Sequence, residues 1–201
     1  RITATTNVDP ANNETRLTWL LEPANDPGEL MSGAVLVPLA AETRALLDAC
    51  YTLSASLNRN ASVSQLAQAV ARIAADVGLT DSAAVTFLVQ PKQFVVEATT
   101  GAAREAAEGQ FASHEGPACR TLSDSELRQF DSETSAEWPD HAKYLQGLGL
   151  RFELALPLSF RNIKATLSVY QGGEQPFAVE TRERLSLFAR HAATVLAQAD
   201  V

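Results

Sequence analysis

Two neighbouring segments near the end of the chain alternate between apolar and mixed positions, and this alternation restricts the possible folds more than any other feature. The segments span 152–159 and 165–171, and residues 160–164 join them. Because successive side chains of a strand point to opposite faces, we predict two paired strands with one fully apolar face. Every second residue forms that face: Phe152, Leu154, Leu156 and Leu158, then Ala165, Leu167 and Val169. Helices are expected to cover it.

The opposite face of the same two segments is small, polar and aromatic. It carries Glu153, Ala155 and Pro157 from the first segment and Thr166, Ser168 and Tyr170 from the second. Binding pockets combine an enclosed surface with a few well-placed polar groups. We therefore predict a partly wet pocket on this face of the sheet.

Three segments have the three-and-four spacing of apolar residues that is typical of helices, namely 40–57, 63–77 and 179–199. The first and last carry apolar seams, formed by Leu46, Cys50, Leu53 and Leu57 and by Leu185, Phe188, Ala192, Val195 and Ala199. Seams of this kind favour a partner helix, so we predict a parallel homodimer built from both. In the alternative, each chain satisfies both seams internally.

The remaining segments complete an α+β order of elements with an antiparallel sheet, helices on one face and loops on the other. We expect strands at 83–90 and 94–99, joined by a tight turn, and short helices at 116–123 and 138–146. Residues 1–13 are interpreted as a loose arm, followed by candidate strands at 15–21 and 34–39. The predicted parts are an N-terminal arm or extension (1–40), a seam helix (41–61) and the main domain (62–201).

The charge balance argues against direct nucleic-acid binding, because 16 Lys and Arg face 24 Asp and Glu, for a net charge of −8. No apolar run approaches the roughly 20 residues of a membrane helix, and the beginning lacks a signal-peptide pattern. Cys50 and Cys119 form no CxxC pair. We expect a cytoplasmic protein, and since the chain begins at Arg1 we expect it to be a piece of a longer one.

Several short stretches resemble the GAF family, in the form common in actinobacterial regulators. In order they are Glu115-Gly116-Pro117, Trp138-Pro139, Gly149-Leu150-Arg151, LALPL at 154–158, LSVY at 167–170, Phe177, and Phe188 to Ala193. The resemblance covers about 62–199. It implies a GAF-like antiparallel sheet, terminal helices packed together on one face, and a ligand pocket on the other. The chain departs from this form at Ala118, where Cys is frequent, and at Phe152 and Glu153, where smaller residues are usual.

The resemblance implies a sensory, regulatory domain that binds a small molecule and controls a signalling or transcription-related output through dimer helices. Such domains often precede output modules, including RNA-binding antitermination domains of the ANTAR type. The predicted ligand site combines the mixed strand face with the loops over it: Phe111, Pro117, Cys119, Trp138, Glu153, Ala155, Ser168 and Tyr170. The alternative function is a dimerisation or protein-docking module without a ligand.

No residue pattern indicates an enzyme. The sequence has no GxGxxG, GxxxxGK, GxSxG or HExxH motif. Cys119 lies near a predicted helix start, which can make a thiol reactive, but we favour a buried packing role. The acidic residues from Asp124 to Asp140 are interpreted as a solvated surface.

No cofactor is indicated either. His114, His141 and His191 lack metal-ligand spacing. His114 or His141 as an axial haem ligand is the less favoured reading, and an exposed or capping histidine the favoured one. Trp138 and Phe111 are candidates to stack on a planar ligand, and for Trp138 anchoring of its loop in the core is the alternative.

Overall fold

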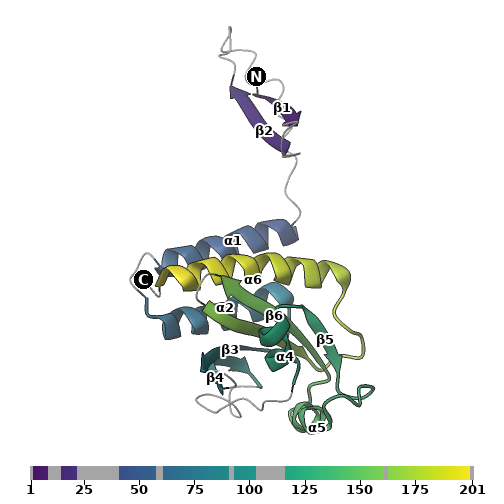
Figure 1. Ribbon diagram of the computed structural model, residues 1–201. Coiled ribbons are helices and arrows are strands. Elements are labelled where there is room, and N and C mark those ends of the chain that lie inside the picture. The colour runs from purple at the N-terminus through teal and green to yellow at the C-terminus, as the bar shows by residue number, and fades with distance from the viewer. Residues whose placement is uncertain are drawn as a thin grey trace. The chain divides into compact units, whose positions relative to one another are not determined.

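The computed structural model describes residues 2–8, 15–21, 41–57, 61–90, 93–102, 116–160 and 163–199 (Figure 1). The chain divides into two compact units, 1–39 and 40–201.

The first unit contains an antiparallel pair of strands, β1 (Ile2–Val8) and β2 (Thr15–Leu21). β2 lies where the sequence predicted a strand, but β1 corrects the prediction of a loose arm. Its threonines are β-branched residues that favour strands, and their polarity had suggested a turn-rich segment. The candidate strand at 34–39 lies outside the described residues.

The second unit is built on a five-stranded antiparallel sheet in the order β4-β3-β7-β6-β5. Its strands are β3 (Ser82–Gln90), β4 (Gln93–Gly101), β5 (Arg128–Asp131), β6 (Phe152–Phe160) and β7 (Ile163–Gln171). β6 and β7 pair in the predicted register, with Leu156 opposite Leu167. β5 was not predicted, because a strand of this length is too short for alternation to stand out.

Helices lie on both sides of this sheet. They are α1 (Ala41–Leu57), α2 (Val63–Gly78), α4 (Pro117–Asp124), α5 (Pro139–Gly147) and α6 (Val179–Ala199). α2 packs on β3 and β4, α6 packs on β6 and β7, and α1 packs on α2 and α6 (Figure 1). A capping box between Ser62 and Gln65 begins α2, and Leu79 ends it in the left-handed conformation.

The apolar sheet face forms the main core, as the alternation predicted. Leu154, Leu156 and Leu167 are buried in one cluster with side chains of α2 and α6, such as Leu66 and Phe188. The mixed α+β fold and its helix-covered antiparallel sheet are therefore confirmed.

The central residues of the two helical seams pack within the chain. Leu53, Leu185 and Val195 are buried in the same core. α1 and α6 run parallel, because Arg184 pairs with Glu42 at 3.5 Å near their beginnings and His191 Nε2 lies 3.1 Å from the Cys50 carbonyl oxygen further along. The prediction that these seams provide a dimer interface therefore needs correction: each seam finds its partner inside one chain.

Truncating Leu156 tests the assignment of the sheet faces. We expect Leu156→Ala to lower the free energy of unfolding by about 2 to 5 kcal/mol, measured by urea denaturation, because it leaves a cavity between β6 and the helices. Leu79→Ala is the control, since 86% of Leu79 is exposed, and it should cost about 0.5 kcal/mol or less. Equal losses for the two variants would contradict the assignment.

Candidate functional site

The second face of the sheet is a buried polar surface beneath the two short helices. Glu153, Ala155, Ser168 and Tyr170 are all buried on it. α4 is fixed over β6 and β7, in part because the Thr166 hydroxyl donates to the Ala118 carbonyl oxygen at 3.1 Å. The sequence predicted a partly wet face, whereas these side chains contact one another and the covering helices.

Glu153 is the centre of this surface. The alternation of β6 turns its side chain away from the apolar core, and no part of it is exposed (0%). Its Oε2 lies 2.5 Å from Nε2 of His141 on α5, and the Ser168 hydroxyl donates to its Oε1 at 2.7 Å. A buried carboxylate requires such partners, since an unpaired charge in a protein interior is strongly destabilising.

His141 and Glu153 form a charged pair. Burial by itself would lower the pKa of His141, but the charge of Glu153 and the hydrogen bond to it outweigh burial and raise that pKa above its ordinary value. The protonated imidazole is therefore favoured, with Nε2–H donating to the carboxylate. The pair links α5 to β6, the strand next to the edge strand β5.

The negative charge of Glu153 also acts on three other acids around it. Burial and then Glu153 raise the pKa of Tyr170 well above its ordinary value, and the same two causes raise the pKa of Tyr144. Burial and then Glu153 raise the pKa of the Cys119 thiol to about 12. All three groups stay protonated near neutral pH, so Cys119 is a packing residue rather than a reactive thiolate.

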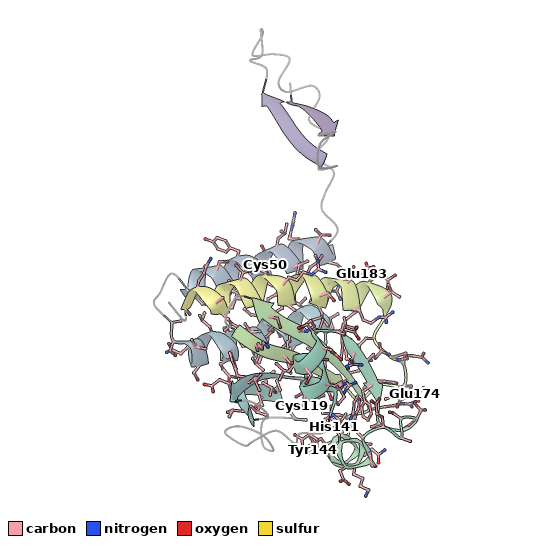
Figure 2. The ribbon with its side chains drawn as sticks, in the orientation of Figure 1. Cys50, Cys119, His141, Tyr144, Glu174 and Glu183 are labelled. Carbon is pink, nitrogen blue, oxygen red and sulfur yellow. The ribbon has the colours of Figure 1, made fainter. Side chains whose placement is uncertain are left out.

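Two aromatic rings lie close to the imidazole. Phe130 of β5 lies 5.4 Å from His141 and Tyr144 of α5 lies 6.1 Å from it, between ring centroids. Figure 2 labels His141 and Tyr144 next to each other near α5. Trp138 packs on Phe130 at 5.6 Å and immediately precedes α5. Trp138 therefore anchors its loop in a second, smaller apolar cluster, which includes Phe130, Leu145 and Tyr170. Its contact with a ligand stays a prediction.

The structure brings most of the predicted site residues together. The Ser168 hydroxyl donates to Glu153. The negative charge of Glu153 also acts, after burial, on the pKa of Tyr170 and of Cys119. Ala155 pairs with Ser168 across β6 and β7, and Pro117 is buried at the start of α4. Phe111, like His114, lies outside the described residues.

Three residues of the cluster were not among the predicted site residues: His141, Phe130 and Tyr144. His141 had been considered only as a haem ligand or a capping residue. One sequence feature could have identified His141 as a site residue: it lies on a short predicted helix just after Trp138, one turn before Leu145, which is buried. Nothing in the sequence paired that helix face with Glu153.

No group of three or more His, Cys, Asp or Glu side chains in the described residues is arranged to hold a metal ion. None of the helices in the same residues is long and apolar enough to span a membrane.

Comparison with known proteins identifies one family. The sequence matches the GAF domain family over residues 60–197. No curated protein is similar enough to count as a match.

Solved structures share the fold at low identity. The GAF domain of a phosphoenolpyruvate-protein phosphotransferase from Coxiella burnetii is 17% identical with a TM-score of 0.65, covering 80% of this chain and 97% of that one. A phycoerythrobilin-bound GAF domain from a cyanobacterial phytochrome is 12% identical with a TM-score of 0.64, covering 77% and 96%. The GAF-B domain of DevS from Mycobacterium smegmatis is 24% identical with a TM-score of 0.55, covering 67% and 92%.

The raised pKa of His141 predicts a pH-dependent stability. The charged pair stabilises the fold fully below the unfolded pKa of about 6.5 and loses this contribution as pH rises through the higher folded pKa. In urea denaturation, the stability difference between the wild type and His141→Gln should therefore be larger at about pH 6 than at about pH 9. Asp140→Asn, an exposed change on the same helix, should show no such trend. A difference for His141→Gln that stays constant with pH would exclude the charged pair.

Proposed function

The chain belongs to the GAF domain family, and on that premise we propose that it is a sensory module which binds a small molecule at the polar face of its sheet. GAF domains are generally regulatory modules that bind small molecules. We place this one in the cytoplasm as a regulator rather than an enzyme. An output domain of a signalling or transcription-related kind, such as an ANTAR domain of actinobacterial type, is the partner that the resemblance implies.

One observation carries this proposal: a fully buried carboxylate lies where stability alone would favour apolar residues. On the other face of the same strands, every buried side chain is apolar. Replacing a buried ion pair by well-packed apolar residues is often neutral or stabilising. Glu153, His141 and Ser168 are therefore better explained by recognition than by packing, since perturbed titratable groups gather at functional sites.

The cluster also has a physical route to the helices. β6 carries Glu153 on one face and Leu154 and Leu156 on the other, where they pack against α6. His191 of α6 contacts α1 through the Ser54 hydroxyl at 2.9 Å. A ligand that favours one arrangement of β6 would shift α6 and α1, provided that its affinity differs between the two arrangements.

A small-molecule ligand is present in one similar structure, since the phytochrome GAF domain described above is bound to phycoerythrobilin.

One observation favours the alternative, a docking module without a ligand. The polar groups on the sheet face already satisfy one another, as expected of a collapsed pocket.

Native mass spectrometry of freshly purified protein separates these two functions. We expect a bound mass that is released on denaturation, lost in Glu153→Gln and retained in Glu126→Gln, which removes an exposed carboxylate. Glu153→Gln keeps the side-chain shape but removes the charge that holds His141. The bare polypeptide mass, both as purified and after incubation with cell extract, would favour the docking module.

We also propose a parallel homodimer, with its interface on the outer surface of the helices rather than on the buried seams. Leu47 and Tyr51 are exposed on α1 (54% and 77%), and Leu187 is exposed on α6 (55%). Leu187 lies with Val179 and Leu127 along an open groove. Exposed apolar side chains on two neighbouring parallel helices favour association with a second copy.

Sedimentation equilibrium at micromolar concentrations tests this interface. We expect twice the chain mass of 21.5 kDa for the wild type and a folded monomer for Leu47→Glu combined with Leu187→Glu. Leu79→Glu is the matched control, because Leu79 is exposed at the end of α2, and it should remain dimeric. A wild-type mass near 21.5 kDa throughout would exclude the dimer.

A further inference from the structure

An open groove lies between α6 and Leu127, the residue just before β5. Its volume is about 560 Å³. Its apolar lining is formed by Leu127, Val179 and Leu187, which are 40%, 53% and 55% exposed. Apolar side chains grouped in a concave surface favour a protein partner, because covering them removes apolar area from water. The groove therefore favours an occupant that carries apolar side chains of its own.

Three charged residues of α6 also line the groove: Arg182, Glu183 and Arg190. None of the three has an ion-pair partner among the residues that the structure describes. In the same part of the chain, Nε of Arg182 is buried without a hydrogen-bond partner. The order of charges along the groove is positive, negative, positive. An occupant with the opposite order would complement it.

The exposed face of α1 has this complementary pattern. Leu47 and Tyr51 are 54% and 77% exposed, and their spacing of four residues places them on one side of the helix. The charged residues of α1 are Glu42, Arg44 and Asp48, in the order negative, positive, negative, and all three are exposed. Neither Arg44 nor Asp48 forms an ion pair within the described ranges of the chain. α1 therefore carries both the apolar side chains and the charge order that fit the groove.

Contacts inside one chain fix the heights of α1 and α6, which lie side by side (Figure 1). They join Glu42 to Arg184, Cys50 to His191 and Ser54 to His191, at numbering differences of 142, 141 and 137, so each α1 residue is level with the α6 residue about 140 positions later. A two-fold axis parallel to the helices leaves every height unchanged. The same relation then holds between α1 of one copy and α6 of the other.

This relation brings the two patterns into register. Leu47 of the second copy is level with Leu187, an exposed apolar residue of the groove. Each charge of the groove lies within two residues of the level of an opposite charge on α1, which is about 3 Å along a helix. The opposite charges are Glu42 with Arg182, Arg44 with Glu183, and Asp48 with Arg190.

An antiparallel α1 would not fit the groove in this way. If Leu47 is again level with Leu187, reversing the helix brings Arg44 level with Arg190. Two like charges would then face each other and repel. The order of the charges therefore selects the parallel orientation.

We propose that the groove of α6 receives α1 of a second copy in a parallel arrangement, with Leu47 and Tyr51 against its apolar lining. Arg44 and Asp48 of that α1 face Glu183 and Arg190. The inference rests on the proposed homodimer and specifies how its two copies pack. The two-fold axis forms the contact twice. Exposed ion pairs contribute little affinity, so the apolar side chains hold the copies together and the charges set orientation and register.

Reversing the charges tests this arrangement by sedimentation equilibrium. Asp48→Arg and Arg190→Asp should each raise the dissociation constant at least about tenfold, because each places like charges together at both symmetric contacts. The variant that combines both changes should return to within about threefold of the wild type, since opposite charges face each other again. Asp140→Arg is the control, because it reverses a charge on α5 that is 97% exposed, and it should dimerise as the wild type does.

Mixing the proteins gives a second readout that a folding defect cannot imitate. The combined variant should pair with itself but not with the wild type, because every contact of a mixed dimer would bring two like charges together. Native mass spectrometry of the variant mixed with isotopically labelled wild type should therefore detect the two homodimers and little mixed dimer. A statistical proportion of mixed dimer would overturn the proposed packing.

The outcomes also separate this packing from the homodimer itself. Suppose that the wild type is dimeric and that Leu47→Glu combined with Leu187→Glu is monomeric. If the single charge reversals then leave the dissociation constant unchanged, or the combined variant does not recover, the homodimer stands and the packing is wrong. If the wild type is monomeric, both are wrong.

Discussion

The alternation of a single strand organises this domain. β6 lies between two different environments, and each residue along it belongs to one or the other. A slip of one residue in its pairing would exchange the faces and move Glu153 into the apolar core under α6. The cost of burying an unpaired carboxylate there therefore makes the register of β6 and β7 highly specific. The positions of α6 and of the polar cluster both follow from that register.

The charge of Glu153 sets a second constraint. Because the carboxylate is buried completely, it needs a cationic partner, and His141 of α5 fulfils that role. α5 is therefore attached to the sheet by chemistry that depends on protonation as well as by the packing of Ala142 and Leu145. A further polar contact, from the Gln146 amide to the Ser132 carbonyl oxygen at 2.8 Å, links the helix to the segment after β5.

The sequence predicted those features that depend on local periodicity. The faces of β6 and β7, the apolar stripe of α2 and the C-terminal helix could all be recognised within one segment of chain. The pair between Glu153 and His141 could not, because it depends on how α5 docks on a strand, and nothing in either segment specifies that docking. The helical seams illustrate the same limit: spacing shows that Leu53 and Val195 need apolar neighbours but not which chain supplies them. In this structure, the same chain does.

The packing of the sheet against α6 and α1 determines how a change at the sheet reaches these helices. Since the seams are satisfied internally, α1 and α6 are tied together by packing, by Arg184 with Glu42 and by His191. A shift of β6 would therefore reach them together, because α6 packs closely on β6 and is tied to α1. In the mechanism proposed above, the groups that bind a ligand lie on one face of that strand and the output helices lie on the other. Such a mechanism requires no long pathway, because only one sheet separates the two, but it does require two arrangements of β6 with different affinities for the ligand.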